Sequence, residues 1–172
     1  MKKFFTLIVA TLMASSMMAQ MHGAMTFAGA SSVNVQTQNT GNACDTVRFE
    51  MASMSAGNIT LPVMQGMAAI PSFTIENVAF SMGENHVISI AEQAFTSKVT
   101  VNGEEKNIEG SSISGSYNMA DNSLTLKAVF KYGSMPFDLT YEVKAYYVKP
   151  VASAITVNVG GTFIYGNDGV TY

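Results

Sequence analysis

The segment from Met135 to Val148 alternates apolar and polar residues almost without error, and this pattern constrains the fold more than any other in the chain. One parity holds Met135, Phe137, Leu139, Tyr141, Val143, Ala145 and Tyr147. The other holds Asp138, Thr140, Glu142 and Lys144. A period of two is that of a β-strand with one buried and one solvated face. At roughly 3.3 Å per residue the pattern predicts a strand of about 45 Å, long enough to follow a curved sheet.

Shorter alternating segments fill most of the remaining chain, and no helical period appears after the first twenty residues. The predicted strands cover residues 24–38, 46–53, 58–64, 73–82, 86–90, 95–101, 105–109, 113–119 and 124–130. The polar residues 36–45 predict a loop. Because short turns join most of the strands, the sequence predicts an all-β antiparallel meander that closes into a barrel, with a flattened β-sandwich as the alternative.

Two local signals define turns and corners of this sheet. Asn102-Gly103 lies between two strands and predicts a two-residue hairpin turn, since both central residues of a type I′ turn need a positive φ. In residues 73–82 the apolar side chains change from one face of the strand to the other near Glu76-Asn77, which predicts a bulge or a corner there. A second bulge is predicted at Ala91 to Ala94. We expect the residues after Pro150 to add one or two strands that return to the first strand.

The start of the chain has the pattern of an export signal. Met1-Lys2-Lys3 is basic, residues 4–18 are apolar, and small residues lead to Ala19. The apolar stretch is too short for a comfortable membrane span, so we expect a helical signal peptide cleaved after Ala19. The mature chain, residues 20–172, is then one β-barrel domain. No cysteine follows the signal directly, so we expect a protein that is exported to the periplasm or outside the cell, without a lipid anchor or a membrane span.

Charge and cysteine content exclude several classes of function. The chain has nine Lys and Arg against twelve Asp and Glu; without Lys2 and Lys3 the net charge is about −5. No basic patch is available for nucleic acid. The single cysteine, Cys44, allows no internal disulfide and, with only two histidines, no zinc site. We therefore expect no metal and no cofactor; the pattern predicts no particular oligomeric state.

No arrangement of residues predicts catalysis. Ser112, in the segment Gly110 to Ser114, lacks the final glycine of a nucleophile elbow, and His86 is its most plausible base. Glu104, Glu105 and Glu109 lie beside the Asn-Gly hairpin, where a solvated loop is expected rather than a pair of catalytic carboxylates. We therefore predict that the protein is not an enzyme.

The residues FTIENVAFSM, VTVNGEE, EGSSISGSYN and NSLTLKAVFKYGSMPFDLTYEV carry a resemblance. Together they resemble the calycin-like, lipocalin-like β-barrel domains of secreted bacterial proteins, over residues 46–149, with residues 150–172 as extra strands. The resemblance implies a barrel of about eight strands, in a family described as lipid-binding or as hydrolases without defined residues. It implies no catalytic position in this chain.

These observations predict a secreted, non-catalytic barrel that binds a small apolar or lipid-like molecule in its interior or mouth. The alternative is a structural or protein-interaction module whose interior is filled, and a lipid hydrolase is a distant third. Met51, Met54, Met64, Met67 and Met82 fit either core packing or an adaptable apolar pocket. The predicted ligand-binding residues share inward faces: Phe80, Tyr117, Phe130, Phe137 and Tyr141.

Overall fold

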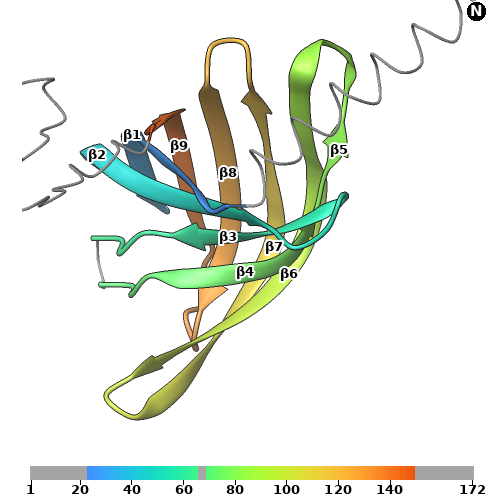
Figure 1. The fold of residues 1–172 in the computed structure, drawn as a ribbon. Coiled ribbons are helices and arrows are strands. Elements are labelled where there is room, and N and C mark those ends of the chain that lie inside the picture. The colour runs from blue at the N-terminus through green and yellow to red at the C-terminus, as the bar shows by residue number, and fades with distance from the viewer. Residues whose placement is uncertain (1–22, 66–68, 150–172) are drawn as a thin grey trace, which may run out of the picture.

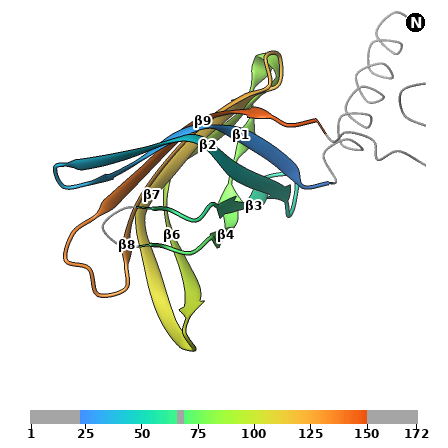
Figure 2. The same ribbon diagram turned by 90° about the vertical axis from the view of Figure 1, so that its left-hand side faces the viewer.

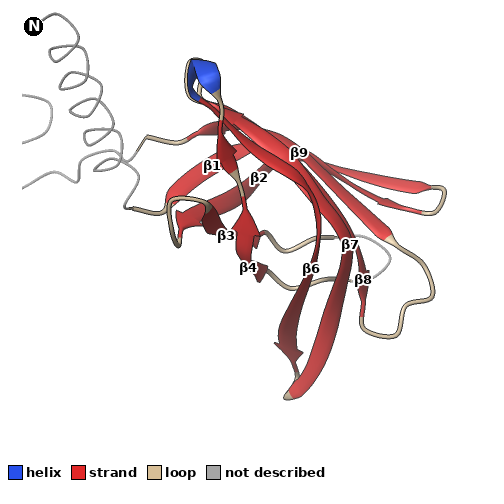
Figure 3. Cartoon of the chain, turned by 90° about the vertical axis from the view of Figure 1, so that its right-hand side faces the viewer, coloured by secondary structure: helices blue, strands red, loops and turns tan. Residues whose placement is uncertain are grey.

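The structure is a computed structural model, and it describes residues 23–65 and 69–149. Nine strands and one short 3₁₀ turn form in this part of the chain (Figures 1 and 3). Their bounds are β1 Met25–Val35, β2 Gln38–Met51, β3 Ala56–Leu61, β4 Phe73–Ala79, β5 Ser81–Met82, η1 Glu84–His86, β6 Val87–Val101, β7 Glu104–Asn118, β8 Ser123–Tyr132 and β9 Leu139–Tyr147. The predicted signal peptide and the tail after Pro150 lie outside the described residues.

All nine strands belong to one antiparallel sheet that curves into a nearly closed barrel (Figure 1). The strand order is β4-β3-β2-β1-β9-β8-β7-β6-β5. The chain therefore runs as two meanders, β1 to β4 and β5 to β9, which are joined where β1 pairs with β9. The predicted all-β antiparallel barrel is confirmed, and the flattened sandwich is not the fold.

The inward faces of the strands form one continuous apolar core. Aromatic rings from strands that are not neighbours in the sheet meet inside it. Phe73 of β4 contacts Phe130 of β8 with ring centroids 5.3 Å apart, and Phe27 of β1 contacts Tyr117 of β7 at 4.9 Å. These contacts cross the barrel, so the protein's own side chains fill its interior, as in other small barrels.

The predicted bulges and turn are present. Gly57 pairs with Val78 and Ile59 with Ile75, so β4 carries one extra residue at Glu76-Asn77, where Asn77 has a φ of 56°. The β6–β7 register shifts twice between Ile90 and Phe95. Asn102 and Gly103 have φ values of 52° and 82°, as a type I′ turn requires. β6 covers two short strands that the sequence predicts as separate, residues 86–90 and 95–101, and the bulge lies between them.

The predicted loop at residues 36–45 is wrong. The β1–β2 hairpin turns at Gln36-Thr37, and β2 begins at Gln38. Figure 2 shows this hairpin extending away from the body of the barrel. Every residue of β2 before Asp45 is exposed, so both faces of this part of the strand carry polar residues. Because neither face is buried, the alternation that marks a strand is missing.

The predicted strand from Met135 to Val148 is too long. β9 begins only at Leu139, and Gly133 to Asp138 form a turn and loop. Gly133 has a φ of 58°, and Pro136 has no N–H to give to a ladder. From Leu139 to Ala145 the predicted parity holds, with every second residue buried. β9 pairs with β1, which is paired with β2 on its other side.

Candidate ligand-binding cleft at the barrel seam

The barrel wall has one seam, where β4 and β6 run side by side without a backbone ladder. β5 continues from β4 and pairs with β6 through Ser81–Ser89 and Met82–Ile88. Beyond that pair, the bulges at Glu76-Asn77 and at Ala91 to Ala94 turn the two strands apart. The sequence places a bulge in each strand of the seam, and a bulge bends its strand and interrupts pairing.

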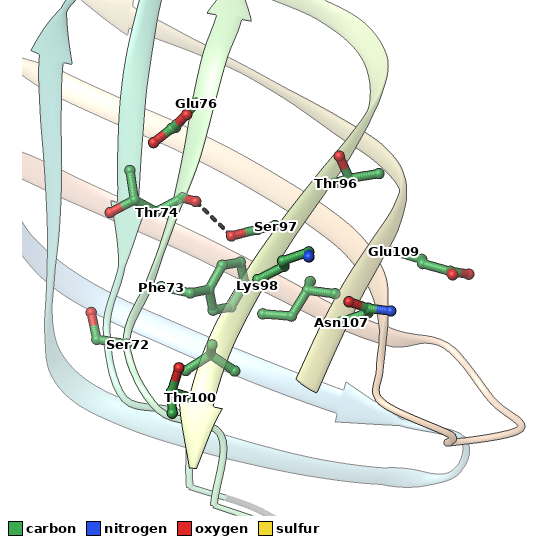
Figure 4. Close-up of a pocket in the computed structure, with 12 residues that line it drawn as sticks. Ser72, Phe73, Thr74, Glu76, Thr96, Ser97, Lys98, Thr100, Asn107 and Glu109 are labelled. Atoms are coloured by element: carbon green, nitrogen blue, oxygen red, sulfur yellow. Dashed lines mark hydrogen bonds between the residues drawn. The ribbon is translucent and has the colours of Figure 1, made fainter. Parts of the chain in front are cut away.

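Side chains bridge this seam in place of a ladder. The amide nitrogen of Gln93 donates to the carbonyl oxygen of Ala79 at 2.8 Å, and the amide oxygen of Gln93 accepts from the Ala79 N–H at 2.9 Å. Further along, the Ser97 hydroxyl donates to the Thr74 carbonyl at 2.6 Å (Figure 4). A buried or half-buried strand edge needs such partners for its backbone groups, and here β6 supplies them from its side chains.

A cleft of about 870 Å³ opens where the seam widens between β4, β6 and β7 (Figure 4). Its apolar side chains are Phe73, Val99 and Ile108. The remaining lining is polar: Ser72, Thr74, Glu76, Thr96, Ser97, Lys98, Thr100, Asn107 and Glu109. This volume lies within the range of small-molecule sites, about 300–1,000 Å³. The arrangement is a limited apolar surface surrounded by hydroxyl, amide and charged groups.

The hydroxyl groups of the two serines in the cleft are engaged in structural hydrogen bonds. Ser72 donates to the Leu61 carbonyl at 2.6 Å, and Ser97 donates to Thr74 as above. Lys98 forms an ion pair with Glu105 at 2.7 Å on the exposed side of the β6–β7 hairpin. Neither Glu76 nor Glu109 takes part in an ion pair within residues 23–65 and 69–149. The cleft therefore carries a net negative charge from its own side chains.

The predicted ligand-binding residues are core residues and do not line this cleft. Phe80 is buried against Phe49, with ring centroids 5.6 Å apart, and Phe130 is fully buried between Phe73 and Phe95. Phe137 lies in the loop before β9 and is half-buried against the core. None of the five predicted residues lines the cleft or either of two smaller cavities, at β7–β8–β9 and beside the β1–β2 hairpin.

The two predicted tyrosines are buried with their hydroxyls engaged. Tyr117 donates to Asn122 at 3.4 Å, and Tyr141 donates to Asp45 at 3.5 Å. Burial raises the pKa of Tyr117, and the nearby Tyr147 raises it further. Burial, followed by the charge of Asp45, raises the pKa of Tyr141 well above its usual value. Both side chains therefore act as neutral hydrogen-bond donors within the core.

The residues considered for catalysis are not brought together. The His86 carbonyl accepts from the N–H of Met119, which directly follows β7. Met119 is seven residues from Ser112, roughly 23 Å at 3.3 Å per residue. Glu104 pairs with Lys106 at 2.9 Å, which lowers the pKa of this exposed carboxyl, and Glu105 pairs with Lys98. These carboxylates lie at the exposed hairpin, as the sequence predicts.

The predicted methionines that the structure describes lie in different environments. Met64 is 2% exposed and belongs to the core, and Met51 packs against it. Met54 and Met82 are 72% and 49% exposed. Met67 lies outside the described residues. Of the four predicted methionines that the structure describes, Met51 and Met64 therefore fit the core-packing interpretation, and Met54 and Met82 do not.

Sequence reasoning missed the residues that make the seam. Gln93 and Ser97 sit in polar stretches where nothing distinguishes a bridging side chain from a solvated one. The useful signal was the pair of predicted bulges, because two strands that both bend at their shared edge need side chains to close it. Asp45 was missed as well, although it shares its parity with Val47 and Phe49 and so belongs to the inward face of β2.

Comparison with known proteins supports the fold alone. No family model matches the sequence. No curated protein matches it either. Among solved structures, the barrel is similar to the crystal structure of a Bacteroides fragilis protein described as a "putative outer membrane protein", with a TM-score of 0.56 and 20% sequence identity. The match covers 73% of this chain and 50% of that one, so the chain spans about half the length of its structural neighbour.

Proposed function

We propose that the protein is an exported, non-catalytic barrel of the calycin-like kind that binds a small, largely apolar, lipid-like molecule in the cleft at its seam. One observation carries the proposal: a cleft of about 870 Å³ with Phe73, Val99 and Ile108 on its lining opens beside a core that is already filled. A ligand in this cleft fits the geometry better than one inside the barrel. Rings that meet across the barrel, such as Phe73 and Phe130, leave the interior to the protein's own side chains.

The chemistry of the lining favours an amphipathic ligand. The apolar portion of such a molecule would cover Val99, the half-buried apolar residue of the lining, and its polar group would meet the hydroxyls and amide at the rim. Glu76 and Glu109 lie at this rim, and the one cation there, Lys98, is already paired with Glu105. A neutral or cationic head group is therefore favoured over an anionic one, since like charges repel across a partly desolvated cleft.

We place the protein in the periplasm or outside the cell. The basic and apolar start of the sequence supports export. Within the described ranges no helix has the length and hydropathy to cross a membrane. On the outward side of the barrel, Lys127 of β8 is paired to Glu142 of β9 at 3.0 Å. The neighbour's description agrees with a location in the cell envelope.

The second candidate is a protein-interaction module. It is favoured by the seam itself, because β4 and β6 each have a ladder partner on one side only over most of their length. An extended segment of another protein could add to such an edge. The hydrogen bonds from Gln93 and Ser97 oppose this, since they already occupy backbone groups of Ala79 and Thr74. We therefore rank the small-molecule function first.

Native mass spectrometry of the protein purified from its own host tests the proposal. We expect a bound small molecule that is lost on Val99→Asn, because this change places an amide on the apolar lining. Val129→Asn is the matched control: Val129 is also half-buried on a strand, in β8, and lies outside the cleft lining. If Val99→Asn and Val129→Asn both retain the bound molecule, binding in the cleft is contradicted. Protein isolated without any bound molecule, yet with a co-purifying polypeptide, would favour the second candidate.

A further inference from the structure

A buried carboxylate lies at the point where the β1–β2 hairpin leaves the barrel. Asp45 is the first inward-facing residue of β2 and is 7% exposed. It lies opposite Gly29 of β1, while the next recorded pair along the hairpin joins Ser31 to Asn42, so the hairpin carries a bulge here. The bulge brings Asn42 within reach of the carboxylate from three residues away.

Three neutral groups donate hydrogen bonds to Asp45. Ser31 and Tyr141 donate to one carboxylate oxygen, the tyrosine at 3.5 Å. The side-chain nitrogen of Asn42 donates to the other oxygen at 2.5 Å, and the side-chain oxygen of Asn42 accepts from the Cys44 N–H at 3.2 Å. A carboxylate can accept about four hydrogen bonds, so one acceptor position is left after these three.

No cation balances this carboxylate in the part of the chain that the structure describes. The ion pairs there all lie on exposed surface: Arg48–Glu50, Lys98–Glu105, Lys106–Glu104 and Lys127–Glu142. Burying an unpaired charge is costly, and hydrogen bonds from neutral donors offset only part of that cost. A positive group placed beside Asp45 would therefore be bound favourably.

A cavity next to Asp45 offers space for such a group. It has a volume of about 270 Å³, and Ser31, Asn42 and Asp45 are part of its lining. The rest comes from Val33, Thr40 and Gly41 of the hairpin and from Val63, Met64 and Gln65 after β3. The cavity thus combines the buried carboxylate with apolar walls from Val33, Val63 and Met64. It is separate from the seam cleft, since the two share no lining residue.

We propose that this cavity is a second binding site, for a small organic cation with a primary ammonium group. The ammonium donates to the free acceptor position of Asp45, and the attached carbon chain contacts the apolar walls. A metal ion fits less well, because hard cations take six or more oxygen ligands and Asp45 is the one carboxylate that lines the cavity. Ser31, Asn42 and Tyr141 also direct their hydrogens toward the carboxylate.

Three probes of equal length that differ in charge test the site: n-butylammonium, n-butanol and n-butyrate. We expect n-butylammonium to shift the backbone amide signals of Ser31, Gly41 and Asn42 saturably in nuclear magnetic resonance titrations of the labelled protein. n-Butanol should bind at least tenfold more weakly, and n-butyrate should leave the signals unchanged. Asp45→Asn should weaken n-butylammonium at least tenfold, whereas Asp138→Asn, which removes an exposed charge, should not.

Equal binding of n-butanol and n-butylammonium would overturn the proposal. Unchanged binding of n-butylammonium to Asp45→Asn, or the absence of any saturable shift with n-butylammonium, would overturn it as well. Because Asp45→Asn could fail to fold, Thr40→Tyr provides a second variant. Thr40 is exposed on the hairpin, and a tyrosine there fills the cavity from its rim while Asp45 stays intact. Loss of n-butylammonium binding in Thr40→Tyr supports the site; unchanged binding contradicts it.

Discussion

The side chain of Gln93 pairs with the backbone of Ala79 as a neighbouring strand would, donating to its carbonyl oxygen at 2.8 Å and accepting from its N–H at 2.9 Å. A primary amide has the same donor and acceptor as a peptide group, so it can replace one rung of a ladder. The bulges in β4 and β6 prevent a backbone rung at this point. The Gln93 side chain thus bridges the seam between β4 and β6 at this point, as Ser97 does further along.

Gln93→Ala should lower the free energy of unfolding by about 1–2 kcal/mol, since the two hydrogen bonds to Ala79 and one to the Ala91 carbonyl are lost from a half-buried side chain. Urea denaturation measures this change. The control is Gln38→Ala, which truncates an exposed glutamine in β2 and should change stability by less than about 0.5 kcal/mol. Hydrogen exchange of the Ala79 amide should also accelerate in Gln93→Ala. If both variants lose the same stability, Gln93 does not hold the seam.

Tyr141→Phe should make stability less sensitive to alkaline pH. The folded-state pKa of Tyr141 is raised by burial and by the charge of Asp45, so its contribution is fully present below pH 10 and is lost as pH rises above it. Above pH 10 the unfolded chain releases the Tyr141 proton while the folded chain keeps it. The free energy of unfolding therefore falls by at most about 1.4 kcal/mol per pH unit. Urea midpoints between pH 8 and pH 11 should fall less steeply in Tyr141→Phe than in wild type.

The matched control for this slope is Tyr146→Phe, because Tyr146 is 52% exposed on the same strand. Its pH profile should follow that of the wild type. At pH 7, Tyr141→Phe should cost about 0.5–1.5 kcal/mol through the lost hydrogen bond to Asp45. A profile for Tyr141→Phe that superimposes on the wild type would show that burial and Asp45 do not raise the pKa of this hydroxyl in the folded state.

Gly29→Ala should destabilise the barrel by about 1–3 kcal/mol, as overpacking does. A Cβ at Gly29 would collide with the backbone carbonyl of Lys144 in β9, and a backbone atom inside a ladder cannot move aside. Gly41→Ala is the control from the same hairpin, where the nearest atom, Ser31 O, lies 3.9 Å from the new Cβ. Thermal unfolding should rank Gly29→Ala well below Gly41→Ala; equal melting temperatures would contradict the close approach of β1 to β9.

Leu139→Ala should cost about 2–5 kcal/mol, because Leu139 is buried at the start of β9. Phe137→Ala should cost less than Leu139→Ala, although phenylalanine is larger, since Phe137 is half-buried in the loop before the strand. Thr140→Ala, on the outward face, should change stability by less than about 0.5 kcal/mol. If urea denaturation shows a larger loss of stability for Phe137→Ala than for Leu139→Ala, the buried strand begins earlier than Leu139.

The sequence predicted the strands correctly where one face of the strand is buried and the other is exposed to solvent. Val47 and Phe49 in β2 and the run from Leu139 to Ala145 in β9 have this environment, so their alternation is clear. The prediction failed in the projecting hairpin, because both faces of Gln38 to Cys44 are exposed to solvent and the residues there do not alternate between apolar and polar. It also failed at Met135 and Phe137, which keep the parity of β9 while lying in a loop.

The candidate sites were less predictable than the fold. The inward parity of Phe80, Phe130 and Tyr141 indicated burial correctly, but parity does not tell whether an inward side chain meets a ligand or another side chain. That distinction depends on contacts across the barrel, such as Phe73 with Phe130, between strands far apart in the sequence. The seam cleft depends on how far two bulges separate β4 from β6, which is a three-dimensional quantity.

The pairing of β1 with β9 sets the order in which the barrel can fold. Phe27, near the start of the described chain, pairs with Tyr147, near its end. The β1–β2 and β6–β7 hairpins can form as soon as their own residues are available, but the ladder that joins the two meanders needs nearly all of the chain. Closing such a long loop costs entropy before any contact rewards it, so non-local ladders slow folding. The barrel therefore closes late, and β1 keeps one free edge until β9 arrives.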